Sequence, residues 1–191
     1  MNKKRSLKNI AEVITGYTFR TALRIQEGGS LFVLQAKDIS DGLSIHAESL
    51  DQINFECSRS KAIVHAGDVI ISSRGGFRAG VLNSDDSQNI VAASSVFILR
   101  LKTDTISPEF LAVFLNSLVG QKQLNEKATG AAINTILRKD LENIRIPIPD
   151  IKTQEKVVHL YQSNKKLQKA LAWKMKLINN INEVAISKLL Q

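Results

Sequence analysis

The sequence predicts a mixed α/β domain that is followed by one long C-terminal α-helix. Short runs of β-branched and aromatic residues recur within the first hundred positions, and a capped helix is indicated near residue 107. After Pro149 the chain contains neither Gly nor Pro, and its apolar residues recur at steps of mostly three or four. Such steps are typical of a helix, whereas short β-branched runs are typical of strands. We therefore expect a domain over residues 1–150 and a helix within residues 151–191.

The first segment is predicted to form a short helix and then a loop. Ser6 is a suitable N-cap for a helix whose apolar residues would be Leu7, Ile10, Ala11, Val13 and Ile14. Residues 16–30 contain two successive glycines and read as a loop. Three strands are then expected at residues 31–35, 69–73 and 96–101, each bounded by Asp, Gly, Ser or Asn.

A helix is predicted to begin at Ser107-Pro108-Glu109, because serine caps, proline suits the first turn and glutamate meets the positive end of the helix dipole. Its apolar face would consist of Phe110, Leu111, Phe114, Leu115 and Leu118. Residues 129–132 should end the helical stretch that follows. Residues 144–149 should be extended, because each proline disfavours helix in the residue before it.

The last helix is predicted to begin with Thr153 as its cap. Its apolar stripe comprises Val157, Leu160, Tyr161, Leu167, Leu171, Met175, Ile178, Ile181, Ala185 and Leu189. Residues 153–191 would span about 58 Å as a helix, which one small domain cannot cover. We therefore expect the stripe to pair with a second copy through Leu160, Leu167, Leu171, Met175, Ile178, Ile181, Ala185 and Leu189. The alternative is two helices with a break near Lys174.

The charge distribution favours a polyanionic partner. The chain has 26 basic and 18 acidic residues, and its last 41 residues alone carry a net charge of +6 against +2 for the first 150. Such a balance suits nucleic acid or an acidic protein surface, or simply a solvated lysine face. One cysteine allows no internal disulfide, and neither a membrane span nor a secretory signal is apparent, so we expect a cytoplasmic protein without membrane contact.

The sequence offers little catalytic chemistry. His46, His65 and His159 are scattered without metal-ligand spacing, and residues 75–80 are rich in glycine but are not followed by the Lys of a phosphate-binding loop. We expect no cofactor and no metal. One enzymatic alternative stays open: Asp140, Asp150 and Lys152 imitate the acids and lysine of a small metal-dependent nuclease.

Polar and basic residues that follow strands or lie in loops are the candidates for DNA contact. Arg and Lys can bond guanine, Gln and Asn can pair with adenine, and Thr and backbone amides can hold phosphates. The candidates are Arg20, Arg24, Gln35, Lys37, Arg59, Lys61, Arg74, Arg78, Asn134, Thr135, Arg138 and Lys139. Each alone could be a solvated loop residue, but as a set in a basic chain they favour a DNA-binding module.

The chain resembles the specificity subunits of type I restriction–modification systems. The resemblance is carried in order by residues 14–20, 34–39, 66–75, 107–111, 115–117 and 129–131. Its most specific part is the Ile-Arg-Ile-Pro-Ile-Pro run at residues 144–149, followed by Ile151 and Gln154. Asp150 stands where the family often has a second proline, and Lys152-Thr153 where a glutamate often precedes the glutamine. These are minor departures.

The resemblance implies a non-catalytic protein that directs an adenine methyltransferase, and sometimes a restriction translocase, to a bipartite site on double-stranded DNA. It implies a target-recognition domain with a twisted sheet over residues 1–150. The protruding helix, within residues 151–191, would form an antiparallel coiled coil that spaces two recognition domains. Typical members carry two such domains and two helices, so this chain resembles a half-subunit that forms a homodimer. A third possibility, a helix-mediated interaction protein that never touches DNA, also stays open.

Overall fold

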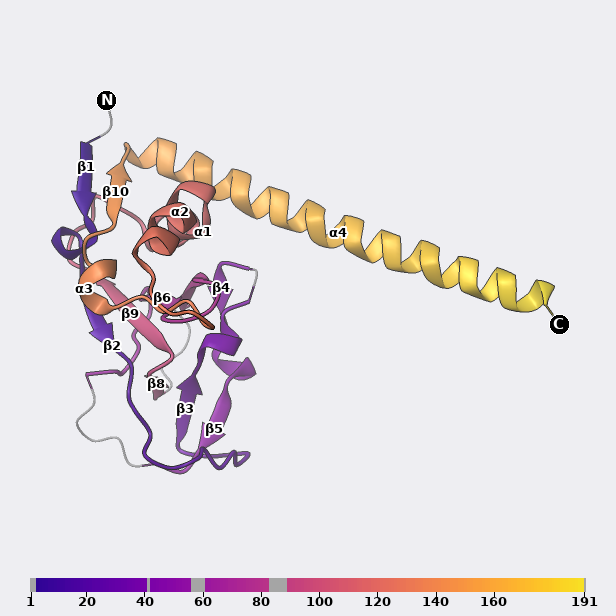
Figure 1. Ribbon diagram of the computed structural model, residues 1–191, viewed down its shortest axis with the longest axis horizontal. Helices are drawn as coiled ribbons and strands as arrows, with labels where there is room; N and C mark the ends of the chain where they lie inside the picture. Colours follow the sequence, from indigo (N-terminus) through magenta and orange to yellow (C-terminus); the bar gives the residue numbers. More distant parts are fainter. Residues whose placement is uncertain (1–2, 41, 56–60, 83–88, 191) are drawn as a thin grey trace.

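A computed structural model describes residues 3–40, 42–55, 61–82 and 89–190. It consists of a globular domain and one helix, α4 (Ile151–Leu189), which starts on the domain and then extends far beyond it (Figure 1). The helix is continuous, so the predicted alternative of two helices with a break near Lys174 is wrong. No helix in the described part of the chain is both long and apolar enough to cross a membrane.

A five-stranded sheet forms the centre of the domain. Its order is β2-β9-β6-β7-β4, with β7 and β4 parallel and the other neighbours antiparallel. Its strands are β2 (Ala11–Thr15), β4 (Ser44–Ile45), β6 (Val69–Ser72), β7 (Ala79–Leu82) and β9 (Val96–Leu101). The predicted strands at 69–73 and 96–101 are thereby confirmed as β6 and β9.

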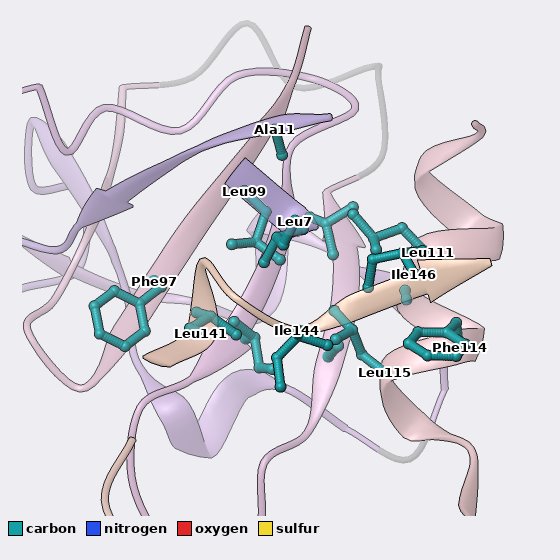
Figure 2. Packing of buried hydrophobic residues seen from close by; sticks show 14 of the residues in the cluster. Leu7, Ala11, Phe97, Leu99, Leu111, Phe114, Leu115, Leu141, Ile144 and Ile146 are labelled. Atoms are coloured by element: carbon teal, nitrogen blue, oxygen red, sulfur yellow. The ribbon is translucent and has the colours of Figure 1, made fainter. Parts of the chain in front are cut away.

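The central sheet is buried on both faces. Successive strand residues point to opposite faces, so in β9 Phe97 and Leu99 join the core under the helices while Ile98 joins the core on the other side. Figure 2 shows Leu99 next to Leu7, in the same buried cluster as Leu111 and Ile146. The strand runs therefore read as almost continuously apolar rather than alternating.

A three-stranded sheet covers the second face. Its order is β5-β3-β8, in which β3 pairs antiparallel with β5 and parallel with β8. The strands are β3 (Leu31–Leu34), β5 (Asp51–Ile53) and β8 (Ile90–Ala92), and β3 confirms the predicted strand at 31–35. Leu34 packs between the two sheets, whereas Val33 faces a third cluster that includes Tyr17, Phe19 and Phe55.

The helices α1 (Pro108–Asn116), α2 (Leu118–Lys127) and α3 (Arg138–Leu141) lie on the first face. Ser107 caps α1 as predicted, since its hydroxyl accepts a hydrogen bond from the amide of Phe110. Leu118, in contrast, does not lie on the predicted buried face and is 91% exposed. The chain ends α1 at Asn116 and starts a new helix, so Leu118 no longer continues the spacing of Phe114 and Leu115.

The predicted N-terminal helix is wrong. The segment forms strand β1 (Lys3–Ser6), the short 3₁₀ turn η1 (Leu7–Asn9), and then strand β2. Further 3₁₀ turns are η2 (Ala36–Asp38) and η3 (Ala47–Ser49). Strand β1 pairs antiparallel with β10 (Arg145–Ile148), the extended segment expected before the long helix. Tertiary pairing thus outweighs the local helical spacing of the apolar residues.

The buried amide of Gln154 anchors α4 to the domain. Gln154 is 1% exposed, although almost every other residue of this helix is partly or fully exposed. Its Oε1 accepts a hydrogen bond from the amide of Ser107 at 2.9 Å, and its Nε2 donates to the carbonyls of Thr105 and Pro149, both at 2.9 Å. One side chain thereby joins the start of α1, the segment before it and the start of α4.

Helix α4 begins at Ile151, and its cap is Asp150 rather than the predicted Thr153. The Asp150 carboxylate accepts hydrogen bonds from both the hydroxyl and the amide of Thr153, which lowers the pKa of Asp150. This contribution to stability is present above the ordinary carboxyl pKa and is lost as the pH falls through the lowered value. Thr153 still takes part in the cap, but as a hydrogen-bond donor in the first turn.

The predicted single stripe of α4 divides between two faces. Val157, Val158 and Tyr161 pack against the domain, on the same side as Gln154. Leu160, in contrast, is 62% exposed. At about 100° per residue, Leu160 lies roughly 120° around the axis from Gln154, whereas Tyr161 lies within a small sector of it. The first turns of the helix therefore bury one face and expose another.

Replacing Gln154 with Leu should destabilise the domain. The side-chain volume is nearly kept, but a buried amide and two carbonyls lose their partner, so we expect the free energy of unfolding to fall by about 2–3 kcal/mol. Urea unfolding followed by circular dichroism at fixed chain concentration measures this. Gln168→Leu, at an exposed position of the same helix, is the control and should change stability by about 0.5 kcal/mol or less. Equal effects of the two variants would contradict the anchoring role.

Candidate nucleic-acid interface

The turn between β8 and β9 brings together three segments that are far apart in the sequence. The amide of Tyr17 donates to the carbonyl of Ala92 at 2.7 Å, at the start of the 16–30 loop. The amide of Ala36 donates to the hydroxyl of Ser95 at 3.2 Å, and the amide of Ser73 donates to the Ser95 carbonyl at 2.9 Å. Three segments that each carry predicted candidates therefore meet at this turn.

Arg74 lies beside Asn134 and Thr135. Arg74 and Thr135 form an isolated antiparallel bridge, and the amide of Gly75 donates to the carbonyl of Asn134 at 2.8 Å. Gly75 has a positive φ of 77°, which a side chain would disfavour and which allows the chain to reverse directly after Arg74. Arg74 and Asn134 are exposed, so their side chains are available to a ligand at this edge.

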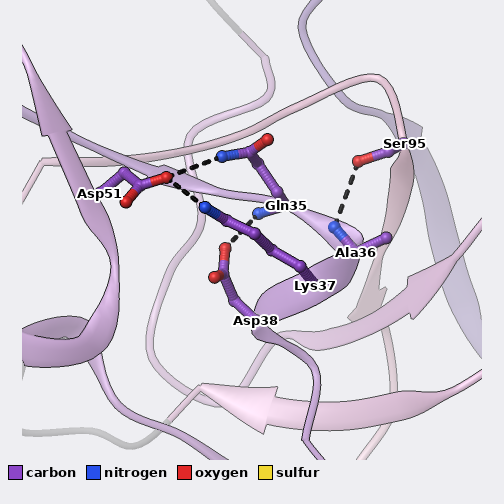
Figure 3. Close-up of polar contacts among 6 residues, drawn as sticks. All are labelled: Gln35, Ala36, Lys37, Asp38, Asp51 and Ser95. Atoms are coloured by element: carbon purple, nitrogen blue, oxygen red, sulfur yellow. Dashed lines mark hydrogen bonds and ion pairs between the residues drawn. The ribbon is translucent and has the colours of Figure 1, made fainter. Parts of the chain in front are cut away.

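Gln35 and Lys37 are held by Asp51, as Figure 3 shows. The Nε2 of Gln35 donates to Oδ2 of Asp51 at 3.1 Å, and the Lys37 ammonium pairs with the same oxygen. The carboxylate of Asp38 accepts a hydrogen bond from the backbone amide of Gln35 at 2.7 Å, and the amide of Asp38 donates to the backbone carbonyl of Gln35 at 3.1 Å. Asp51 thus holds the side chain of Gln35, and Asp38 holds its backbone.

The electrostatics of this network keep the lysine charged. The hydrogen bond to Asp51 raises the pKa of Lys37, although its side chain is more than half exposed. Burial raises the pKa of Asp38, partly offset by the hydrogen bond from the Gln35 backbone. Asp51 therefore holds the Lys37 ammonium and orients the Gln35 side-chain amide at the end of β3.

Arg20 and Arg24 line a pocket of about 480 Å³ with an aromatic base. Tyr17, Phe19 and Phe55 contact one another edge to face, with ring centroids 4.9–5.5 Å apart. The loop is tied to β5, because the amides of Gln26 and Gly28 donate to the backbone and side chain of Gln52. Two exposed arginines are thus carried on an anchored loop rather than on a free one.

The remaining candidates are more dispersed. Arg138 of α3 pairs with Glu142, the residue that follows this helix, at 2.8 Å, and Lys139 is exposed on the same helix. Lys61 is exposed, and Arg78 lies on the surface after the Gly75-Gly76 turn. Arg59 lies outside the residues that the structure describes.

The nuclease alternative gains no support. Asp150 caps α4, and Asp140 lies in α3 on the other side of β10. Among the described residues, no group of three His, Cys, Asp or Glu side chains could hold a metal ion.

Two residues of the interface carry no signal in the sequence. Asp51 is acidic and stands at the start of a strand, so nothing in a search for basic contacts points to it. Ser95 lies in a turn with no distinguishing pattern. Their roles depend on contacts across 16 and 59 positions, which only the folded chain brings together.

The chain is similar to several specificity subunits of type I restriction–modification systems. The EcoBI specificity subunit of a type I restriction enzyme of Escherichia coli is 27% identical over 164 residues, covering 82% of this chain and 34% of that protein. The HsdS subunit from Thermoanaerobacter tengcongensis has a TM-score of 0.62 at 21% identity, over 90% of this chain and 39% of that one. The type I S subunit from M. genitalium has a TM-score of 0.59 at 16% identity, over 92% and 42%.

These solved structures share the fold, and this chain spans well under half of the length of each relative. A family model described as the type I restriction modification DNA specificity domain matches residues 2–183, which is almost the whole chain. The chain therefore belongs to the family of type I restriction–modification DNA specificity domains.

Proposed function

We propose that this chain is a half-subunit that reads one half of a bipartite DNA site and pairs with a second copy through α4. The pair then directs an adenine methyltransferase, and in some systems a restriction subunit, to a symmetric, interrupted palindrome. The chain itself performs no catalysis. The observation that carries this proposal is the free part of α4, residues 166–189, which we call the arm.

The arm exposes apolar side chains that one chain cannot cover. From Lys166 to Leu190 every side chain is exposed, including Leu171 at 53%, Met175 at 61% and Ile178 at 44%. Leu167, Leu171, Ile178, Ala185 and Leu189 fall on one side at about 100° per residue, which is the pattern that a paired helix requires. A long helix with such a face is stabilised by a partner rather than by water. This supports pairing with a second copy.

A second apolar row supports a further protein partner. Trp173 is 68% exposed, Leu177 42% and Val184 57%, and these residues lie roughly 100–160° around the axis from Leu171 and Ile178. One partner helix covers only a narrow seam. The arm can therefore bind a second copy on one side while it offers a separate side to another subunit, which fits the methyltransferase.

The DNA contacts are proposed to lie at the β8–β9 turn and the loops around it. Arg74 and Asn134 supply the donors that read guanine and adenine, and Lys37 and Arg20 supply positive charge on the other segments that meet at the turn. Their loops are fixed to the two sheets by backbone hydrogen bonds, as a reading surface requires. Two copies related by a two-fold axis would meet identical half-sites in opposite orientation.

The double variant Leu171→Asp/Ile178→Asp should convert the protein to a monomer. Two carboxylates in the apolar seam would be desolvated without partners, which opposes pairing. Multi-angle light scattering measures the change. Asn180→Asp/Ser187→Asp adds the same charge on the side of the arm opposite the seam, next to Trp173 and Val184, and should leave the mass unchanged. A monomeric unmodified protein would refute the dimer.

Arg74→Ala should relax the base preference at one position of the half-site. If Arg74 reads a guanine, we expect a cost of about 1–3 kcal/mol against the preferred site and almost none against other sequences. Selection of bound duplexes from a randomised pool measures this. Lys61→Ala is the control for the loss of one exposed positive charge. An unchanged preference after Arg74→Ala would remove Arg74 from the reading surface.

Insertion of seven helical residues into the arm should lengthen the gap between the half-sites. The insertion adds about 10 Å, or about three base pairs, and keeps the apolar face in register. Mapping methylated adenines in DNA exposed to the protein and its methyltransferase tests the proposed function as a whole. The half-site bases should stay the same, and a seven-residue glycine-rich insertion should give no defined gap. An asymmetric site for the unmodified homodimer would contradict the proposal.

A further inference from the structure

We infer that the groove between the domain and α4 is a phosphate-binding site, which holds the DNA backbone outside the bases that are read. The site consists of Lys165, Lys166 and Lys169 on the helix and Ser40, Ser44 and His46 on the domain. Its ligand is the phosphodiester backbone of duplex DNA. This inference rests on the proposed function and adds to it a contact that lies away from the β8–β9 turn.

The groove is a formed feature of the fold. It has a volume of about 420 Å³ and lies where α4 leaves the domain. The charged side chains among its described lining residues are all lysines; Asp41, between Ser40 and Gly42 in the sequence, lies outside the described residues. A smaller pocket of about 270 Å³ adjoins it and shares Ser40, Tyr161 and Lys165. A line of positive charge thus follows the junction.

Tyr161 positions the first lysine. Its ring is half-buried against the domain, and the Lys165 ammonium lies 5.6 Å from the ring centroid. An ammonium over an aromatic face is held there by the ring quadrupole. Lys165 is therefore directed into the groove, whereas Lys166 and Lys169 are exposed and can follow a ligand.

The helix turns Lys165 and Lys169 toward the side on which the domain lies. Gln154, Val158, Tyr161 and Lys165 follow one another at steps of four and three, so they share the domain-facing side of the helix. Lys169 is one turn beyond Lys165 on that side. The seam of Leu171 and Ile178 points elsewhere, so pairing of two arms leaves the lysines open.

The chemistry favours a phosphate backbone over a base. Lysine is a mobile point charge that pairs with phosphate oxygens without directional readout, and serine hydroxyls can donate to the same oxygens. Lys165 and Lys169 lie about 6 Å apart along the axis, so they can meet successive charges of one DNA strand. The groove therefore strengthens binding without adding sequence information.

The salt dependence of DNA binding tests the site. Fluorescence anisotropy with a labelled duplex of arbitrary sequence gives the slope of log K against log salt for the full chain. Lys165→Gln/Lys166→Gln/Lys169→Gln should make this slope shallower by about 0.9 for each phosphate that the variant no longer neutralises, up to roughly 3 per chain. Base preference in a randomised pool should not change.

Lys152→Gln/Lys156→Gln/Lys188→Gln is the matched control. It removes the same charge from exposed positions of the same helix that point away from the domain-facing side. A shallower slope for the first triple variant alone supports the groove, and equal slopes for the two triple variants overturn it. Circular dichroism of both variants confirms that the helix is retained.

Two further outcomes separate this inference from the proposed function. If the unmodified chain retains no duplex at any salt concentration, both are overturned. If the first triple variant keeps the unmodified salt slope but no longer binds the methyltransferase, the groove is a protein interface and only the inference fails. Sequence-specific retention of DNA together with equal slopes leaves the proposed function standing and rejects the groove.

Discussion

The direction of the arm depends on one buried amide. Gln154 satisfies its carbonyl oxygen and its amide nitrogen on backbone groups from three segments, so neither the helix nor the domain can turn without leaving buried polar groups unpaired. Val157 and Tyr161 add apolar contact beside it, and beyond them the helix is held by nothing in the described part of its own chain. Any error in the angle at Gln154 would be multiplied along the whole length of the arm.

Much of the fold could be predicted from the sequence, because local and tertiary preferences agree there. The runs at β3, β6 and β9 are β-branched and buried, and the capped start of α1 is specified by neighbouring residues. The N-terminal segment could not be predicted in this way. Its apolar spacing suits a helix, but it forms strands β1 and β2, whose partners β10 and β9 lie more than 80 positions away. The predicted cap differs from Asp150 by three positions for a simpler reason, since Thr153 belongs to the same hydrogen-bonded turn.

The candidate interface was only partly predictable, because residue type indicates a donor but not its neighbours. The chemistry of Arg74 and Asn134 marks both as candidates, yet their proximity depends on a bridge across 61 positions between Arg74 and Thr135. Lys37 is recognisable as a cation, but Asp51, the carboxylate with which it forms an ion pair, belongs to strand β5. The hydroxyl of Ser95 that braces the Gln35–Lys37 segment carries no sequence signal at all.

The pairing of β1 with β10 bears on how such domains can be exchanged. Arg5 lies opposite Ile146, so the strand that opens the globular domain and the strand that closes it run side by side at one corner. A unit whose two ends meet can be cut out and replaced with little disturbance of the chain on either side. Recombination between related genes at these two strands would give a new candidate interface on an unchanged arm, so that, under the proposed function, target choice could evolve independently of assembly.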